Sequence, residues 1–427
     1  MKTWAQLVMA SLVGSCTFYP DPTPADTAGV QDGDAALLFR PDVVVPGSQG
    51  LPDESRQPQP HAPTLGKDPA PRNVRVGWPG RDTSRCLSVV WSTDVDTLAS
   101  RVQLRVADAE DVTDIEGVSF TYGLGLAYRV HEWKTCSDLA PSTAYQYRVG
   151  GDGAWSAWYD YATPAAPGSF DTFTVAMAGD SRGGYEEWGQ LVQKMEQHDP
   201  DFYMFSGDMV EFGTNQGEWI DWLNATGDVF AEKVLVPAHG NHEYLAANYF
   251  ALFSLPHNES WFGVDYGDLT VASLNDSFVP QEQMAVDEVA LMDEVFGASL
   301  GRWKVAMHHR SIYSICDRHG SAEGLREIWE PAYDRHNVDF VVAGHNHIYE
   351  RSVPIRNGTA APAGEGTLYL VTGGAGAPIY NDFKPEWFNE VVNPTKHYVI
   401  AEFGPEGVTL TARDMSDTVI DSVMIPR

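Results

Sequence analysis

The sequence predicts an α/β protein with a layered core that follows a small all-β domain. Between residues 70 and 165, short runs of alternating apolar and polar residues recur with turn residues between them. From Phe170 onward, apolar strands alternate instead with segments of helical periodicity. The chain has 427 residues, of which 43% are hydrophobic, so it can bury more than one core and is not disordered throughout.

The net charge of the chain argues against one class of binding partner, nucleic acid. Lys and Arg number 28 and Asp and Glu number 59, which gives a formal net charge of −31. Proteins that coat DNA or RNA need basic side chains to displace counterions from phosphates, so we expect no coating of nucleic acid. A small anionic substrate is still compatible with this charge if a metal supplies local positive charge.

The first 16 residues have the composition of a secretory signal. Lys2 is followed by an apolar run over residues 4–13, which is too short to span a bilayer. The run ends in Leu12-Val13-Gly14-Ser15-Cys16, which resembles a bacterial lipobox with Cys16 as the lipidated residue. The alternative is an ordinary signal peptide with an incidental cysteine. In both cases we expect an extracytoplasmic protein, either secreted or lipid-anchored to a bacterial membrane or cell surface, with no other contact with the membrane.

Residues 17–69 are rich in Pro, Asp, Ala and Gly, and we expect a disordered linker there. Residues 70–165 then predict a β-sandwich. In the run from Cys86 to Ser92, Leu87, Val89 and Trp91 share one face, and further short strands follow as far as Ala162. This segment contains no catalytic constellation, so we interpret it as a structural or positioning module.

The cysteines leave an alternative open. By strand parity Cys86 and Cys136 both face away from the core, and neighbouring strands would allow a surface disulfide in an oxidising compartment. Two unpaired thiols are the other reading. Cys316 lies in a loop of the second domain, and we expect a free thiol there.

The second domain, residues 170–427, alternates strands and helices. Expected strands begin at Phe173, Phe202, Val234, Val305 and Val338, and expected helices cover 186–198, 217–230 and 325–336. The stretch 368–424 is rich in strands. Polar residues that can ligate metals recur just beyond the carboxyl ends of these strands, which is the edge where open α/β sheets bind ligands: Asp180, Asp208, Asn241, His308, His345 and His347.

Two sets of motifs resemble known families. The segment Leu139-Ala-Pro-Ser-Thr-Ala-Tyr-Gln-Tyr resembles a signature of fibronectin type III domains, in which a tyrosine hydroxyl caps backbone. The strings Gly179-Asp180, Gly207-Asp208, Gly240-Asn-His-Glu243, Val305-Ala-Met-His308 and Gly344-His-Asn-His347 resemble the calcineurin-like metallophosphoesterases, and among them the purple acid phosphatases. The resemblance implies a four-layer β-sandwich flanked by helices, behind the fibronectin-like domain.

The resemblance also implies a site. Asp208 would bridge two metal ions, Fe, Zn or Mn, with Asp180 and His347 on the first ion and Asn241, His308 and His345 on the second. A metal-bound hydroxide would hydrolyse a phosphate ester of a small phosphorylated substrate. His242 would contact the phosphate or protonate the leaving group, and Glu243 would orient it. His309 and His319 would lie near the rim, His319 about where relatives place a leaving-group histidine.

The sequence departs from the family pattern at the first metal. Purple acid phosphatases carry a tyrosine three residues after the bridging aspartate, where this chain has Glu211. Other metallophosphoesterases carry a histidine two residues after the first aspartate, where this chain has Arg182. Glu211 would ligate directly, or it would pair with Arg182, and Arg182 could also bind the substrate phosphate. We therefore predict that the protein is not purple.

Two functional hypotheses follow. The first is a dinuclear metal-dependent phosphoesterase. The second is a non-catalytic, surface-anchored binding protein whose phosphoesterase domain is degenerate. The set of ligand positions together with His242 favours the first, because no structural role requires those residues together.

Overall fold

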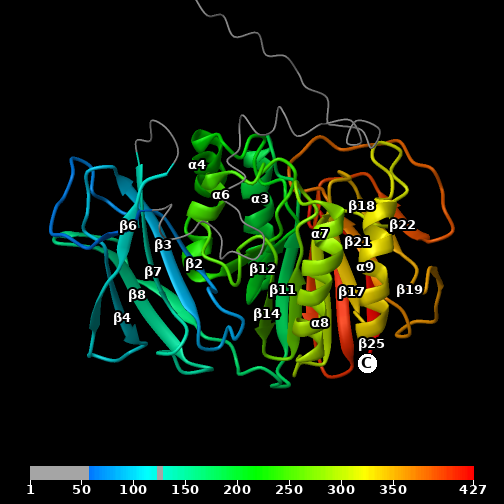
Figure 1. Ribbon diagram of the computed structural model, residues 1–427, viewed down its shortest axis with the longest axis horizontal. Helices are drawn as coiled ribbons and strands as arrows, with labels where there is room; N and C mark the ends of the chain where they lie inside the picture. The colour runs from blue at the N-terminus through cyan, green and yellow to red at the C-terminus, as the bar shows by residue number, and fades with distance from the viewer. Residues whose placement is uncertain (1–56, 123–127) are drawn as a thin grey trace, which may run out of the picture.

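The computed structural model describes residues 57–122 and 128–427 (Figure 1). The expected signal segment, the lipobox-like Cys16 and residues 17–56 of the expected linker lie outside these residues. Residues 57–69 also belong to the expected disordered linker, but they are ordered. Strand β1 (Gln59–Pro60) pairs with β6 (Val118–Phe120), and His61 accepts a hydrogen bond from the backbone N–H of Ser100 at 3.0 Å. The linker prediction does not hold here because these backbone and side-chain groups find partners on the sandwich.

The first domain is a sandwich of two antiparallel sheets, drawn in blue and cyan at the left of Figure 1. One sheet has the order β1-β6-β7-β3-β2, and the other has the order β10-β8-β4-β5 with β9 beside β8. Tyr145 accepts the backbone N–H of Ala140 at 2.9 Å, as the fibronectin-like signature predicts. The other strands of the sandwich are β2 Arg72–Gly77, β3 Leu87–Asp94, β4 Arg101–Val106, β5 Thr113–Glu116, β7 Tyr128–Thr135, β8 Ala144–Gly151, β9 Ala154–Trp155 and β10 Tyr159–Ala162.

Cys86 and Cys136 form a disulfide, which settles the alternative that strand parity leaves open. Cys86 is buried, with only 2% of it exposed, whereas Cys136 is exposed, so the bond reaches the surface at Cys136. The loop at Gly80 covers it: a Cβ atom on Gly80 would lie 2.5 Å from the sulfur of Cys136. Cys316 is buried and forms no disulfide within the part of the chain that is described.

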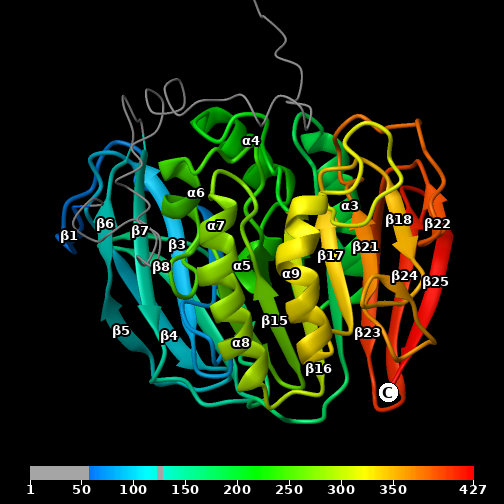
Figure 2. The same ribbon diagram turned by 45° about the vertical axis from the view of Figure 1, so that its right-hand side comes forward.

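The second domain contains two sheets packed face to face between helices, which makes four layers (Figures 1 and 2). Helix α3 packs on the first sheet, whereas α8 and α9 cover the second. The first sheet has the order β13-β12-β11-β23-β24-β25, with β11 Phe173–Ala178, β12 Phe202–Phe205, β13 Val234–Pro237, β23 His397–Phe403, β24 Gly407–Asp414 and β25 Val419–Pro426. The second has the order β14-β15-β16-β17-β21-β18-β22, with β14 Phe262–Tyr266, β15 Leu269–Ser273, β16 Trp303–Arg310, β17 Phe340–Gly344, β18 Tyr349–Ser352, β21 Leu368–Thr372 and β22 Asn389–Asn393.

A small ribbon and the helices complete the domain. The ribbon consists of β19 Ile355–Arg356 and β20 Thr359–Ala360. The helix expected over 217–230 is broken, because Gly227 adopts a left-handed conformation with φ of 60° between α4 and α5. The helices are α3 Tyr185–Met195, η1 Glu196–His198, α4 Gln216–Ala225, α5 Val229–Glu232, α6 Ala247–Leu252, α7 Gln281–Gln283, the π-helix η2 Met284–Glu288, α8 Val289–Gly297 and α9 Glu323–His336. No helix among residues 57–122 and 128–427 is both long enough and apolar enough to cross a membrane.

Parallel pairing brings several loops to one edge of the domain. In the first sheet β11, β12 and β13 run parallel, and in the second β15, β16, β17 and β21 do so. The carboxyl ends of both sets meet at the upper edge in Figure 1. Polar residues that follow these strands therefore lie close together, although they are far apart in the sequence.

The two domains share one hydrophobic core. Trp78 of the sandwich meets Phe202 of β12 with ring centroids 5.3 Å apart. Tyr147 donates a hydrogen bond to the carbonyl of Ala231 at 2.5 Å, and the buried guanidinium of Arg75 donates to the carbonyl of Leu252. The sandwich is thus packed firmly against the second domain.

Candidate metal centre

Sharp turns present the first functional side chains at the upper edge. Asp180 follows β11, Asp208 follows β12 and His345 follows β17, and their φ angles are 60°, 56° and 66°. Such left-handed conformations are strained for residues other than glycine and are concentrated at functional sites. Each turn directs a carboxylate or an imidazole into the space between the two sheets.

Four lone-pair atoms converge in that space. The Nε2 atom of His309 lies 3.2 Å from Oδ2 of Asp208, 3.1 Å from Oδ1 of Asn241 and 3.3 Å from Nδ1 of His345. Its other nitrogen, Nδ1, donates its proton to the carbonyl of Ser206 at 2.7 Å, which leaves Nε2 available as a ligand atom. We call these four residues the Asp208 cluster.

Burial and charge perturb the pKa values in the cluster. Burial raises the pKa of Asp208, but the neighbouring His309 and His242 outweigh it and hold the pKa well below its usual range. Burial lowers the pKa of His309, and the carboxylates of Asp208 and Asp180 reverse this and raise it to about 10. A proton on His309 therefore compensates the buried carboxylates when no other cation is near.

His308, which the motif resemblance assigns as a ligand, does not lie in the cluster. Along β16 the odd-numbered residues face the other sheet and the even-numbered residues face the helices, so His308 points away from Asp208. Its ring lies 4.9 Å from that of Trp329 of α9, and neither ring nitrogen has a hydrogen-bond partner among the described residues. His309, expected only near the rim, lies at the centre of the cluster instead.

Asp180 and His347 form a second pair of donors beside the cluster. Nε2 of His347 lies 3.4 Å from Oδ1 of Asp180, and Nδ1 of His347 donates to the carbonyl of Pro378 at 2.8 Å. The ring of His347 stacks on Tyr380 with centroids 4.3 Å apart. Asp180 also accepts the backbone N–H of His345 at 2.9 Å, which ties this pair to the cluster.

Arg182 and Glu211 form an ion pair at the same end of the site. Nη1 of Arg182 lies 2.8 Å from Oε2 of Glu211, while its Nε lies 3.7 Å from Oδ2 of Asp208. The sequence leaves two roles open for Glu211, direct ligation of a metal and pairing with Arg182, and the structure has the pairing. The Glu211 side chain is 37% exposed and the Arg182 side chain only 11%, so the guanidinium is the more deeply held partner.

Two further histidines flank the cluster. His242 donates from Nδ1 to the carbonyl of Glu211 at 2.7 Å, and its Nε2 lies 3.9 Å from Oδ2 of Asp208. The ring of His319 lies with its centroid 4.1 Å from that of His345. Both expected catalytic histidines therefore stand beside the ligand group.

Glu243 and Asp276 anchor the backbone of the site residues through hydrogen bonds. Glu243 does not bond to the His242 side chain; its carboxylate accepts the backbone N–H groups of Asp208 at 2.9 Å, Met209 at 2.7 Å and Gly240 at 2.7 Å. Asp276 accepts the backbone N–H of His309 at 2.9 Å. The sequence reasoning missed Asp276, and its position just beyond β15, a further parallel strand, is the signal that points to it.

The donor set fits a metal ion at the Asp208 cluster. Ligand atoms of Asp208, His309 and His345 all lie within 4.8 Å of one another. A carboxylate, an amide oxygen and two imidazoles suit Zn, Mn or Fe better than Ca. Without a cation these lone pairs would face each other in a buried space, which is unfavourable.

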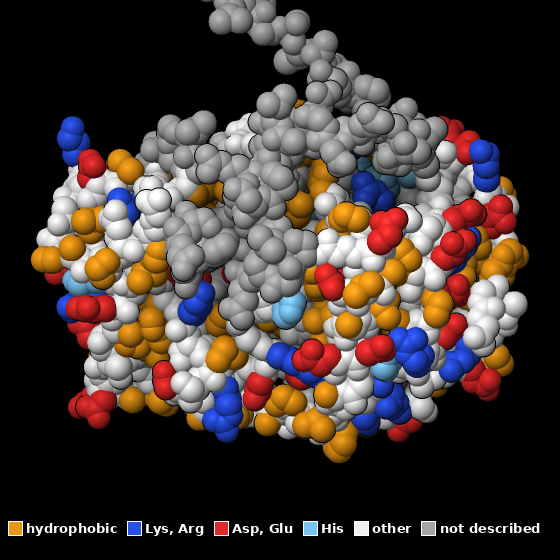
Figure 3. Space-filling model, in the orientation of Figure 1, with side chains coloured by type: hydrophobic (Ala, Val, Ile, Leu, Met, Phe, Trp, Pro, Cys, Tyr) orange, Lys and Arg blue, Asp and Glu red, His pale blue; other side chains and the backbone are white. Residues whose placement is uncertain are grey.

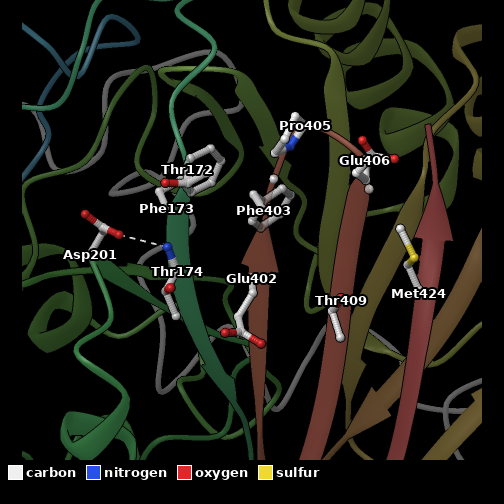
Figure 4. Close-up of a pocket in the computed structure, with 12 residues that line it drawn as sticks. Thr172, Phe173, Thr174, Asp201, Glu402, Phe403, Pro405, Glu406, Thr409 and Met424 are labelled. Carbon is white, nitrogen blue, oxygen red and sulfur yellow. Dashed lines mark hydrogen bonds between the residues drawn. The ribbon is translucent and has the colours of Figure 1, made fainter.

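One pocket of the second domain lies apart from the Asp208 cluster. In Figure 3 histidine and basic side chains gather in a hollow near the upper edge of the second domain. A pocket of about 500 Å³ opens at the opposite end of the first sheet, where β11 begins and β23 ends. Figure 4 shows that its lining includes Phe173, Glu402 and Phe403, and none of the Asp208 cluster residues lines it.

Family models match both domains. Residues 173–349 match the calcineurin-like phosphoesterase model, and residues 71–163 match the purple acid phosphatase N-terminal domain. Together the two models span the sandwich and most of the strands that carry the site.

Individual proteins agree with these matches. Purple acid phosphatase 21 of Arabidopsis thaliana is 28% identical over 72% of this chain and 71% of its own length. An uncharacterized protein of Mycobacterium tuberculosis is 28% identical over 44% of this chain and 44% of its own length. The structure of a purple acid phosphatase from yellow lupin seeds superposes with a TM-score of 0.74 and 18% identity over 84% of this chain and 74% of that one, which shows a shared fold.

Proposed function

We propose that this chain, a calcineurin-like metallophosphoesterase with a purple acid phosphatase N-terminal domain, hydrolyses small phosphate esters at the Asp208 cluster. The observation that carries the proposal is the convergence of Asp208, Asn241 and His345 on Nε2 of His309, all at 3.1–3.3 Å. Catalysis in this family is hydrolysis of phosphoric ester bonds.

The residues of the Asp208 cluster would hold the metal, and His242 or His319 would donate the proton to the leaving group. A bound metal supplies an activated water and offsets negative charge on the phosphoryl oxygens. Asp208, Asn241, His309 and His345 provide the ligand atoms. His242 keeps its Nδ1 proton on the carbonyl of Glu211, so its Nε2 is the atom that can face the leaving oxygen, and it would donate a proton there from the imidazolium form of the ring. His319, whose ring lies against that of His345, is the second candidate for this role.

Buried side chains position these groups in advance. Glu243 fixes the backbone on both sides of Asp208, and Asp276 fixes that of His309. Ligands held in this way need little rearrangement when a metal or a substrate binds.

The experiment is a chelation and reconstitution assay on the purified protein. Hydrolysis of p-nitrophenyl phosphate and of bis(p-nitrophenyl) phosphate should be lost after chelation and return with Zn²⁺, Mn²⁺ or Fe²⁺. The ratio of the two rates distinguishes a monoesterase from a diesterase. No hydrolysis of any phosphate ester under any of these metals would contradict the proposal and support the alternative of a non-catalytic binding protein.

We also propose an extracytoplasmic location, secreted or lipid-anchored. The Cys86–Cys136 disulfide supports it, because such bonds persist mainly in oxidising compartments. The lipobox-like sequence at Cys16 supports the anchored form. Mass spectrometry of the mature protein from its native membrane fraction tests this: a lipid on an N-terminal Cys16 supports the anchor, and an unmodified Cys16 contradicts it.

A further inference from the structure

We propose that the guanidinium of Arg182 takes the place of one metal ion, so that the chain binds a single metal ion, at the Asp208 cluster. The family resemblance implies two ions that share Asp208. This inference rests on the proposed function, and it assigns to Arg182 both the charge of the missing ion and direct contact with a phosphoryl oxygen of the substrate.

The position of Arg182 carries the first part of the argument. Its Nε lies 3.7 Å from Oδ2 of Asp208, the same oxygen that lies 3.2 Å from His309. The guanidinium and His309 thus both lie close to the same carboxylate oxygen of Asp208. An aspartate that bridges two metal ions would have two cations near its carboxylate, and here one of the two cations, the guanidinium, belongs to the chain itself.

Arg182 is also held in place. The backbone N–H groups of Ser181 and Arg182 both donate to the carbonyl of Asp208, at 3.1 and 3.2 Å. The side-chain oxygen of Ser181 accepts a hydrogen bond from Trp222 at 2.8 Å, and Glu211 holds the guanidinium at 2.8 Å. With only 11% of the side chain exposed, the guanidinium cannot swing away without breaking a partly buried ion pair.

The donors left on that side do not suit a second metal ion. Nε2 of His347 lies 3.4 Å from Oδ1 of Asp180. Among the described residues, the group of three mutually close ligand atoms consists of Asp208, His309 and His345 and includes neither Asp180 nor His347. Both oxygens of Asp180 already accept the backbone N–H of His345, at 2.9 and 3.1 Å. A guanidinium has no lone pair to offer a metal, and its permanent charge repels a second cation.

The chemistry of the guanidinium explains what it does instead. It presents its N–H donors in one plane, and Nη1 donates to Oε2 of Glu211 at 2.8 Å. A planar cation of this kind binds phosphate oxygens more directionally than a point charge does. Arg182 would therefore clamp the substrate beside the single metal ion, and would be a catalytic residue.

Metal content tests the inference without reference to activity. The full-length protein is reconstituted with excess Zn²⁺ or Mn²⁺, freed of loosely bound metal and measured by inductively coupled plasma mass spectrometry. We expect one equivalent per chain for the wild type and two for Arg182→His, which restores an imidazole at the position used by other members of the family. Arg105→His, in the sandwich, adds a histidine far from the site and should stay at one equivalent.

The outcomes separate this inference from the proposed function. Two equivalents in the active wild type would overturn the inference and leave the proposed function standing, even if Arg182→His does not fold. No bound metal after reconstitution would overturn both. The substrate contact has its own test: Arg182→Met should weaken inhibition by inorganic phosphate about tenfold. Unchanged inhibition in a folded Arg182→Met would overturn that contact.

Discussion

Nε2 of His309 and Oδ2 of Asp208 lie 3.2 Å apart, and neither side chain is more than 1% exposed. The two residues come from different sheets, and each is anchored through its backbone, His309 by Asp276 and Asp208 by Glu243. The pKa of Asp208 lies well below its usual range because His309 is beside it, and the Asp208 carboxylate raises the pKa of His309, so a proton on His309 is favoured when no metal ion is bound. A metal ion would displace that proton, so metal binding releases protons to solvent.

The first prediction separates the adjacent histidines of β16. His309→Ala removes a ligand atom and should lower kcat/KM at least 100-fold. Even substitution of a residue that only supports a ligand lowers metal affinity or activity 10- to 100-fold. His308→Phe is the matched control, since the His308 ring packs against Trp329. Phosphatase kinetics and metal content of both variants are the measurements. Loss of metal in a folded His308→Phe with retention in His309→Ala would reverse the assignment.

The second prediction concerns Glu243 as a positioning residue. Glu243→Ala leaves three buried backbone N–H groups near Asp208 without their acceptor, and should lower the free energy of unfolding by about 3 kcal/mol. Metal affinity should fall 10- to 100-fold. Glu243→Gln keeps an acceptor oxygen and should recover part of both losses, as measured by denaturant unfolding and metal titration. Equal affinity in all three proteins would show that Glu243 does not position Asp208.

The third prediction is an acid sensitivity that arises in the sandwich. Burial lowers the pKa of His131 to about 3, and the ring stacks on Trp91 between the hydroxyls of Thr93 and Ser100. The unfolded chain protonates this histidine near pH 6.5, whereas the folded chain does not. The contribution of neutral His131 to the free energy of unfolding is therefore fully present above pH 6.5. It decreases as the pH falls below that value, and about 2 kcal/mol is lost at pH 5.

The control for this pH dependence is His131→Gln, which has no charge to gain. Unfolding free energies at pH 7 and pH 5 should differ by about 2 kcal/mol less in the variant than in the wild type. An identical pH dependence in both proteins would mean that His131 is not buried in its neutral form.

The fourth prediction concerns the disulfide. Cys86 and Cys136 are 50 residues apart, and cross-linking a loop of this length restricts the unfolded chain by about 4 kcal/mol. Replacement of both cysteines by alanine should lower the unfolding free energy by about that amount. Cys316→Ala, which removes a buried thiol outside any described disulfide, should cost less. A double variant as stable as the wild type would contradict the prediction.

The fifth prediction is the absence of colour. The position that carries the coloured tyrosinate in purple acid phosphatases is Glu211 here, and Glu211 pairs with Arg182. The iron-loaded protein should therefore show no tyrosinate charge-transfer band in its visible spectrum. Such a band would require a tyrosine ligand that the Asp208 cluster does not contain.

Sequence reasoning predicted the fold well because the strands of the second domain are long apolar runs that end in recognisable polar motifs. The motif resemblance of Val305-Ala-Met-His308 nevertheless points to the neighbouring histidine, His308. The alternation of β16 carries the missing information: Val305 and Met307 face the other sheet, so the next residue on that face is His309. The period of two along β16 therefore identifies His309, as it identifies the core-facing residues of the sandwich strands.

Other parts of the site depend on contacts that sequence spacing does not encode. Arg182 and Glu211 follow different strands, and only the parallel pairing of β11 with β12 brings their side chains together. Asp276 belongs to no motif, and its role depends on backbone N–H groups of β16. The order of residues 57–69 depends likewise on the pairing of β1 with β6.

The most direct test of the central claim measures metal binding and phosphate release together in Asp208→Asn. This substitution keeps the shape of the side chain and removes the charge that faces His309. The account predicts that metal titration detects at least 100-fold weaker binding and that hydrolysis of p-nitrophenyl phosphate falls in parallel. Hydrolysis at the wild-type rate by a folded, metal-depleted Asp208→Asn would show that the reaction takes place elsewhere.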